Sequence, residues 1–400
     1  MAVTVGETSV RTGSRWQLIR AAWAVTAVFA LSNSPTPLYV YWQRELGFSS
    51  GTLTVVFAAY IAGLVAALLV AGRAANRYGR VRVVVPGIVI ALVSAVLFMS
   101  AHSVATLILA RLLVGIAVGV VVSAGMAAVV DLGGESRRHV TSMLASIAMV
   151  FGAGLGPLLG GVIYQITSRP VGWVFSVNIL LLLVALAGYF GLPLERPAGT
   201  RGFPWPRLPQ VPERNLRHVL SGAAVFAPGL TATSFVLSLG PSLLVLAVGN
   251  TSPLLAGGAA CVMFLAATGS QLALGGLTVS RLFALGTVST VLAMSAVVAT
   301  LYTENPGLFV AAALLAGAGQ GLSQLGGLRL IAQHVTGDRR AEANAALNIS
   351  AYLPAAILTV GTGYAIGGFG MRPAVTALAM TVAALGLLLG LTARRAGAEE

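Results

Sequence analysis

The sequence predicts an all-α membrane protein with twelve transmembrane helices in two six-helix halves. Three features lead to this prediction: scarce charge, repeated apolar stretches, and the distribution of arginine between those stretches. Of the 400 residues, 9% are charged and 57% are hydrophobic, whereas soluble domains carry about 25% charged residues. The mean hydropathy of +0.90 agrees. So few charges cannot cover a water-facing surface, and lipid is therefore the expected solvent.

Twelve apolar stretches are long enough to cross a bilayer, which takes about 20 mostly apolar residues. We expect Pro35 and Pro37 to break the first stretch, and Pro241 to break the outer end of the seventh. The stretches are residues 16–41, 49–72, 83–101, 105–131, 139–165, 172–192, 217–247, 252–275, 281–302, 306–334, 342–368 and 372–393.

The arginines between the stretches predict the orientation. With the N-terminus inside, nineteen of the 24 basic residues fall on the inner side and three on the outer side, while Arg111 and Arg329 lie within stretches. This asymmetry is typical of the positive-inside rule. It predicts a multi-pass protein of the cell membrane, in contact with membrane lipids and with both termini in the cytoplasm. The net charge of +13 then reflects topology, and nucleic-acid binding is not expected.

A proline-rich polar segment, PLERPAGTRGFPWPRLPQVPE, separates the first six stretches from the last six. The sequence therefore predicts two helical halves joined by a linker, and we expect a monomer. The expected divisions are a cytoplasmic tail at 1–15, an N-terminal half at 16–192, a cytoplasmic linker at 193–216, a C-terminal half at 217–393 and a second cytoplasmic tail at 394–400.

The two halves share a faint sequence echo in their fourth stretches. Gly115 and Gly119 lie in LLVGIAVG, and Gly317 and Gly321 lie in LLAGAGQG. Each pair precedes an inner loop that contains two adjacent arginines. Internal repeats of this kind build many secondary transporters, whose substrate site lies between the repeats.

Three motifs in the first half combine glycine with an arginine or a proline. GRAANRYGRVR at 72–82 joins the second and third stretches, LILARLLVGIAVG at 107–119 carries Arg111, and GAGLGPLLGG at 152–161 lies in the fifth stretch. Their order resembles the major facilitator superfamily, as does GWVFSVN at 172–178. The third motif resembles the drug:proton antiporter branch of that family. The resemblance covers nearly the whole chain, and it implies the major facilitator fold and transport of a small molecule.

The 72–82 loop resembles the family pattern G-x-x-x-D-R-x-G-R, and the resemblance implies a conformational latch that holds the inner side closed. The positions concerned are Gly72, Asn76, Arg77, Gly79 and Arg80, where Asn76 replaces the usual aspartate. Because Asn76 cannot form an ion pair, we expect a weaker latch that depends on Asp131, paired with Arg77 or Arg80. Topology, capping of helix ends or contact with anionic lipid would also account for the arginines.

Arg111 is expected about 9 Å inside the fourth stretch, given the rise of 1.5 Å per residue. An embedded charge tends to face the bundle interior. It either bonds carbonyl groups of neighbouring helices or takes part in coupling or substrate contact. Proton coupling needs a titratable group, yet none of the 11 acidic residues lies at the middle of a stretch. Glu45, Asp131 and His218 are therefore the candidates.

The fifth-stretch motif has a mechanical interpretation. Its glycines would let helices approach closely, and its proline would bend the helix. The motif could therefore flex as a kink, seal the path against leakage, or serve plain helix packing. The residues concerned are Gly152, Gly156, Pro157, Gly160 and Gly161.

Polar residues inside the stretches are candidates for lining a substrate cavity, because polar groups are tolerated at membrane depth where they line a cavity or bond other helices. Each one alone could equally be a hydrogen bond between helices. The candidates are Asn33, Tyr39, Thr233, Gln320, Gln324, Asn348 and Tyr352.

These features favour an efflux carrier for small amphipathic molecules that works by alternating access and is coupled to protons. The lack of acids in the spans favours neutral or anionic substrates. An uptake carrier or facilitator for a metabolite is the second interpretation. An enzyme is not expected, because no catalytic cluster, metal motif or cofactor motif is present.

Overall fold

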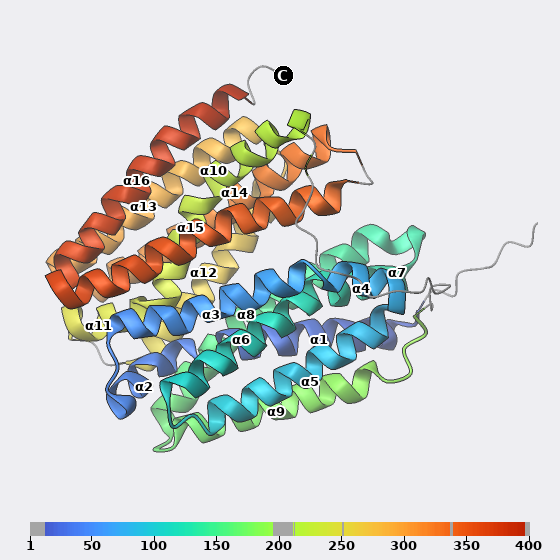
Figure 1. Ribbon diagram of the computed structural model, residues 1–400, viewed down its shortest axis with the longest axis horizontal. Coiled ribbons are helices and arrows are strands. Elements are labelled where there is room, and N and C mark those ends of the chain that lie inside the picture. The colour runs from blue at the N-terminus through green and yellow to red at the C-terminus, as the bar shows by residue number, and fades with distance from the viewer. Residues whose placement is uncertain (1–12, 195–210, 212, 250–251, 337–338, 397–400) are drawn as a thin grey trace, which may run out of the picture.

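The computed structural model describes residues 13–194, 211, 213–249, 252–336 and 339–396, which form helices and turns with no strand among them. Figure 1 shows the helices in two groups. The N-terminal group contains α1 (Arg15–Asn33), the turn η1 (Thr36–Leu38), α2 (Tyr39–Leu46), α3 (Ser50–Leu68), α4 (Ala71–Tyr78), α5 (Arg80–Met99), α6 (Val104–Val120), the π-helical turn η2 (Val121–Gly125), α7 (Met126–Gly133), η3 (Glu135–Arg137), α8 (Arg138–Ile166) and α9 (Pro170–Tyr189). The C-terminal group contains α10 (Glu213–Ser238), α11 (Gly240–Val248), α12 (Pro253–Ala273), α13 (Val279–Thr303), α14 (Pro306–His334), α15 (Arg340–Phe369) and α16 (Met371–Ala396).

Eleven segments of the described chain are long and apolar enough to cross a membrane. The first predicted span is not among them, because α1 is long enough at 19 residues but carries Arg15, Gln17 and Arg20 and is therefore not apolar enough. The chain breaks after Asn33 into α1, η1 and α2. Pro35 and Pro37 lie in this break, as the sequence predicts. The α1 helix still belongs to the bundle, where it packs against α8 and α9 and buries Val25 and Leu31 completely. Pro241 similarly lies just after the boundary between α10 and α11.

Residues 72–82 are not the open loop that the sequence suggests. Ala71–Tyr78 form the helix α4, which buries Ala71 and Ala75 on one face. The reversal of direction occurs at Gly79 alone, whose φ of 92° lies in the region open to glycine. The prediction was wrong here because alanine and arginine favour helix strongly enough to form a short second helix after the turn at residues 69–70.

The glycine echo between the halves corresponds to the same packing in both groups. A Cβ atom at Gly115 would overlap the carbonyl oxygen of Tyr60 on α3, and one at Gly317 would overlap that of Met263 on α12. Gly119 and Gly321 lie against the next turns of the same two helices. The fourth span of each group therefore packs on the second through glycines, which let two helix backbones touch.

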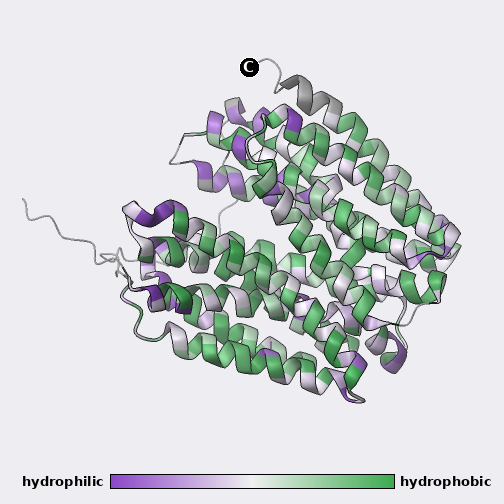
Figure 2. Ribbon diagram, turned by 180° about the vertical axis from the view of Figure 1, so that it is seen from behind, coloured by the Kyte–Doolittle hydropathy of each residue, from purple (hydrophilic) through white to green (hydrophobic). Residues whose placement is uncertain are grey.

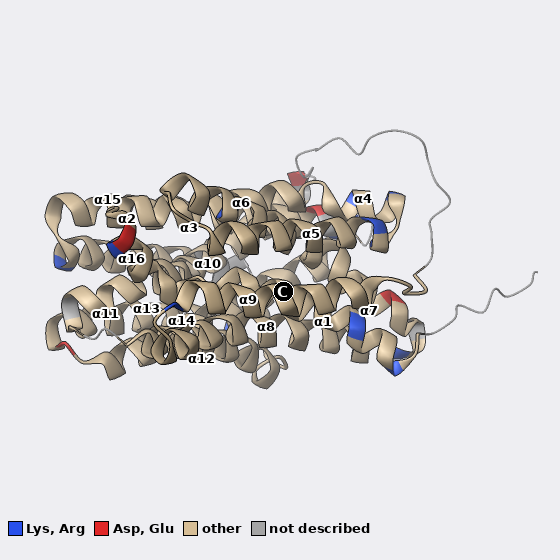
Figure 3. Cartoon of the chain, turned by 90° about the horizontal axis from the view of Figure 1, so that it is seen from below, with Lys and Arg blue, Asp and Glu red and all other residues tan. Residues whose placement is uncertain are grey.

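Arginines gather at the end of the bundle that carries α4, η3 and the start of α15, which we call the arginine-rich end (Figure 3). Several of them bond helix carbonyls there. Arg20 Nε and Nη2 donate to Gly188 O at 2.7 Å and Phe190 O at 2.6 Å, and Arg329 donates to Gly275 O and Leu277 O. A guanidinium can span two carbonyls at once, and its charge complements the negative end of a helix dipole.

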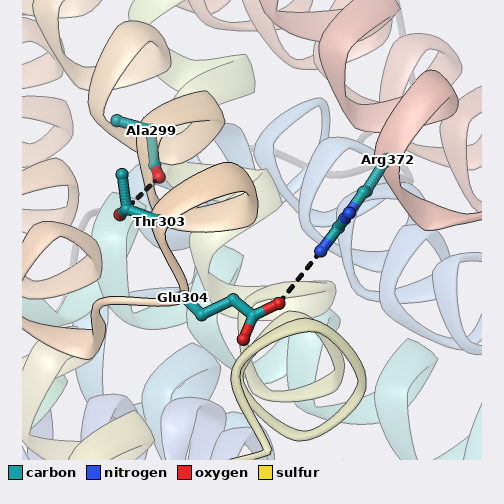
Figure 4. A network of polar contacts seen from close by, with 4 residues as sticks. All are labelled: Ala299, Thr303, Glu304 and Arg372. Atoms are coloured by element: carbon teal, nitrogen blue, oxygen red, sulfur yellow. Dashed lines mark hydrogen bonds and ion pairs between the residues drawn. The ribbon is translucent and has the colours of Figure 1, made fainter.

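The opposite end of the bundle carries fewer charges. There Arg372 at the start of α16 donates to Glu304 at 3.0 Å, just beyond α13 (Figure 4). Glu304 has a positive φ of 56° and caps that helix. Trp173 is 60% exposed near this end and Trp16 is 75% exposed near the arginine-rich end, as aromatic residues at the two faces of a bilayer are. The helices are built mainly of apolar residues between the two ends (Figure 2).

The two groups contact each other over only part of their length. Contacts join α8 to α12 and α3 to α15. Close to the opposite end, Gly51 lies against Tyr364, Gly161 lies against Pro253, and Ser242 Oγ donates to Gln43 Oε1 at 2.8 Å. The ribbons of the two groups diverge toward the arginine-rich end (Figure 1).

The packing at Gly115 gives a first prediction. Gly115→Ala should lower the free energy of unfolding by about 1–3 kcal/mol, because the added methyl group overlaps the α3 backbone. A Cβ at Gly258 would meet nothing within 4 Å, so Gly258→Ala is the matched control and should change stability by less than about 1 kcal/mol. Unfolding of the detergent-solubilised protein measures both. Equal stability of the two variants would contradict the packing.

Candidate functional site

Arg111 lies at the centre of the N-terminal group. The α6 helix begins after Ser103, whose side chain accepts a hydrogen bond from Thr106 N at 3.2 Å and so satisfies a free helix-end donor. Two turns further along, Arg111 is only 2% exposed. Its burial agrees with the expectation that an embedded charge faces the bundle interior.

The contacts of Arg111 come from three helical segments. Nη1 donates to the Ser32 carbonyl oxygen at 2.6 Å, at the end of α1. The guanidinium carbon lies 5.1 Å from the ring centre of Tyr39, 5.5 Å from that of Phe57 and 5.7 Å from that of Tyr60. Cation–π contact and a carbonyl at a helix C-terminus both stabilise a positive charge. Arg111 therefore makes a hydrogen bond to a carbonyl group of a neighbouring helix, which was one of the two roles expected for it.

The loop residues predicted as a latch lie close together at the arginine-rich end. Arg80 Nε donates to Asp131 Oδ2 at 3.1 Å, which joins the start of α5 to α7. Gly79 makes the turn, whereas a Cβ at Gly72 would meet nothing within 4 Å in this conformation. Asn76 is exposed on α4. Gly72 is thus not needed for close packing in this conformation.

Arg77 is half-buried on the same short helix. Its Nε and Nη2 atoms are buried without a hydrogen-bond partner, and its guanidinium carbon lies 5.8 Å from the ring centre of Tyr78. Of the two arginines considered as partners of Asp131, Arg80 makes the ion pair.

The glycines of the fifth-span motif face two different helices. A Cβ at Gly152 or Gly156 would overlap the α1 backbone, at Thr26 and Ala30 respectively. Gly160 lies against Ser34 O and Pro37 in the break that follows. The α8 helix therefore packs against α1 and η1 along one glycine face.

The other face of the motif meets the C-terminal group. A Cβ at Gly154 would lie 3.2 Å from Cys261 Sγ, and Gly161 lies against Pro253 and Leu254 of α12. A Cβ at Gly257 would overlap the carbonyl oxygen of Pro157. The motif thus fixes both the helix break and the contact between the groups.

The family can be established from the chain as a whole. The sequence pattern of the Major Facilitator Superfamily matches residues 21–357. The chain belongs to this superfamily. It is accordingly a membrane transporter of the major facilitator fold and not an enzyme.

Curated relatives of the transporter match only parts of it. The chain is 27% identical over 201 residues to the uncharacterized MFS-type transporter EfpA of Mycobacterium tuberculosis, covering 50% of this chain and 34% of EfpA. It is 29% identical over 214 residues to the multidrug resistance protein MdtL of Escherichia coli, covering 53% of this chain and 50% of MdtL. The match thus spans half or less of the length of these relatives.

Solved structures resemble the transporter over nearly its whole length. A bacterial homologue of the lysosomal transporter Spinster, in an inward-facing and unoccupied conformation, has a TM-score of 0.73 at 15% identity and covers 98% of this chain and 99% of that one. A POT family transporter in complex with 5-aminolevulinic acid has a TM-score of 0.78 at 11% identity, covering 95% and 97%. These likenesses concern the fold.

The polar residues predicted to line a cavity are brought together only in part. Tyr39 meets Arg111, and Gln320 Nε2 donates to Gln324 Oε1 at 3.2 Å within α14. The other candidate side chains with described hydrogen bonds donate to backbone carbonyls of their own helices. Asn33 donates to Phe29 O at 3.2 Å, Thr233 to Leu230 O at 3.0 Å, and Asn348 to Asn344 O at 2.8 Å. Tyr352 is half-buried on α15.

Two of the candidate titratable groups lie far from mid-span. Glu45 is exposed on α2, beyond the break, while Arg111 is buried. His218 on α10 stacks on His334 at the end of α14, with ring centres 4.0 Å apart. Among the residues that the structure describes, Arg111, and not an acid, is therefore the charged group buried inside the N-terminal group.

Sequence reasoning missed several residues that position the site. Phe57 and Tyr60 read as ordinary lipid-facing or core aromatics, yet both rings lie against Arg111. Asn178 Nδ2 donates to Ser34 Oγ at 3.0 Å, and Ser34 Oγ donates to Ala30 O at 2.8 Å. This network holds the break of α1 against α9. Asn178 was visible in GWVFSVN, but the sequence carried no sign of its partner.

The ion pair of Arg80 and Asp131 gives a second prediction. Their side chains are 21% and 49% exposed, so Asp131→Asn should reduce stability by no more than about 1 kcal/mol. It should nevertheless change the balance between conformations, because the pair joins α5 to α7. The maleimide reactivity of Gln324→Cys in a Cys261→Ser background measures that balance.

A matched control exists on the C-terminal group, where Arg339 pairs with Glu342 at 3.2 Å on the surface. Glu342→Gln should leave the labelling rate unchanged. The latch hypothesis is wrong if Asp131→Asn alters neither the labelling rate nor transport.

Proposed function

We propose that the transporter exports small amphipathic molecules by alternating access of its two helical groups, with protons as the coupling ion. The observation that carries this proposal is the uneven contact between the groups. Glycine contacts of α8 with α12 and of α3 with α15 join them near the opposite end, while the ribbons diverge toward the arginine-rich end. Such an arrangement is one of two states between which a rocking carrier moves.

Orientation follows from charge in this proposal. The arginine-rich end faces the cytoplasm of the cell and both termini lie there, as the positive-inside rule predicts. The conformation described is then open to the cytoplasm. We take the working unit to be a monomer in the plasma membrane, with residues 16–192 and 217–393 as the moving halves and 193–216 as their linker.

Export is supported by the glycine and proline motif of α8 and by the similarity to MdtL, a multidrug resistance protein. The motif lies between α1 and α12, where it can act as the seal of the outer side while the inner side is open. The Arg80–Asp131 pair acts as a latch on the cytoplasmic side. Gly152, Gly156, Pro157, Gly160 and Gly161 form the kink and seal.

The uptake carrier or facilitator is kept as the second function, because one observation favours it. Among the described residues, the charge buried within a span is Arg111, two turns inside α6, while Glu45 and Asp131 lie at opposite ends of the bundle. A proton antiporter would need a titratable group such as Glu45, Asp131 or His218 for coupling, whereas a facilitator needs no such group.

Alternating access predicts that a bond across the α8–α12 contact stops transport. Gly154→Cys places a second sulfur beside Cys261, since a Cβ there lies 3.2 Å from Cys261 Sγ. Oxidation should form a disulfide that abolishes transport, and reduction should restore it. The control is Gly154→Cys in a Cys261→Ser background, which should be insensitive to the oxidant. Undiminished transport by the cross-linked protein would exclude rocking at this contact.

Proton coupling and direction are tested together in inside-out vesicles energised by respiration and loaded with a pH-sensitive dye. A panel of neutral, anionic and cationic compounds is added in turn. We expect a substrate to release protons from the lumen, and Arg111→Ala to abolish that release. Substrate that equilibrates without any proton signal would instead establish the facilitator.

A further inference from the structure

Three buried hydrogen-bond donors lie in or beside the break of α1. Arg111 Nε, Tyr39 Oη and Thr36 Oγ1 are buried without a hydrogen-bond partner. The three residues are 2%, 0% and 1% exposed. Thr36 and Tyr39 lie one turn apart in the break, and the Tyr39 ring lies 5.1 Å from the guanidinium carbon. Nearly all buried polar groups in folded proteins have a partner, so this group indicates a missing one.

The chemistry of the missing partner follows from the donors. Arg111 Nε can only donate a hydrogen bond, and both hydroxyl groups can donate as well. One chemical group that accepts several such bonds at once is a carboxylate. A water molecule would satisfy the donors but would not change the charge of the site.

The charge of the site points to an anion. The guanidinium stays protonated in proteins, and the Ser32 carbonyl and the three rings stabilise it without neutralising it. In the part of the chain that the structure describes, Arg111 forms no ion pair, and Asp131 is bonded to Arg80 at the arginine-rich end. A buried charge without a counter-charge is strongly unfavourable.

Aromatic rings provide the rest of the site. Phe57 and Tyr60 on α3 flank Arg111, and α15, which carries Tyr352, packs against α3 from the other group. Tyr60 and Tyr352 are both partly buried against the same core. Such rings bind apolar or aromatic bodies and leave the charged group to the arginine.

We propose that the substrate is an organic carboxylate with an apolar or aromatic body, whose carboxylate binds Arg111 and the Tyr39 hydroxyl. The inference rests on the proposed transport function and names its substrate class. Binding supplies the counter-charge that the protein lacks, and contacts with both groups through Arg111 and α15 make the site sensitive to their movement.

Three probes with one ring test the proposal: phenylacetate, phenylacetamide and phenethylamine. Their transport is measured in proteoliposomes containing the purified full-length chain, together with the thermal shift each produces in detergent. We expect the wild-type protein to prefer phenylacetate over phenylacetamide by about 30-fold or more, as for loss of one partner from a buried charge pair.

Two variants test which residues cause the preference for phenylacetate over phenylacetamide. Arg111→Gln should abolish it while leaving residual transport of phenylacetamide. Tyr39→Phe keeps the ring but removes one donor, and it should reduce the preference by about tenfold. Arg82→Gln removes an exposed arginine at the arginine-rich end and, as the matched control, should retain the full preference. If Arg111→Gln fails to fold, Tyr39→Phe decides the matter.

Equal transport of the three probes by the wild-type protein would overturn the carboxylate site and leave the transport function standing. The same conclusion follows if Arg111→Gln, or Tyr39→Phe in its place, slows all three probes equally, because the residue would then act only in the structure. If no probe crosses the membrane and none shifts the melting temperature, the carboxylate proposal fails. Failure of the wider compound panel in energised vesicles would separately refute the transport function.

Discussion

Direct contact between helix backbones is the constraint on which the rest of the structure depends. Lipid offers little hydrophobic drive for one helix to bind another, so packing relies on small residues that allow close approach. Here Gly115 meets Tyr60 O, Gly317 meets Met263 O, and Gly156 meets Ala30 O. Any side chain at these positions would separate the helices. The positions of Arg111, the α1 break and the contact between the groups all follow from these approaches.

The α8 helix connects packing to function most directly. One of its faces supports α1 and the break that follows, and its other face meets α12 across the boundary between the groups. When one group moves against the other, α8 must therefore change its contacts, and α8 also positions the break beside Arg111. In the proposed mechanism, this shared support gives a physical route by which an occupied site can influence the closure of the outer side.

The arginines serve three different purposes in this chain. At the arginine-rich end, Arg20 and Arg329 each bond two carbonyl groups, and Arg80 pairs with Asp131. Among the arginines that the structure describes, only Arg111 is buried, and aromatic rings surround it. These arginines cannot be told apart by residue type. Their surroundings decide which have a structural role, which can act as a latch and which can bind a substrate.

The sequence by itself determined the membrane class, the positions of most spans, the breaks near Pro35 and Pro241, and the family. Hydrophobic length and proline act locally, so they can be read without knowing the fold. Asp131 as the partner of an arginine was also predicted correctly. Only the tertiary structure decided that Arg80 is that arginine, that residues 71–78 are helical, and that Phe57 and Tyr60 surround Arg111. These contacts join residues distant in sequence, and they depend on how closely the glycines let the helices approach.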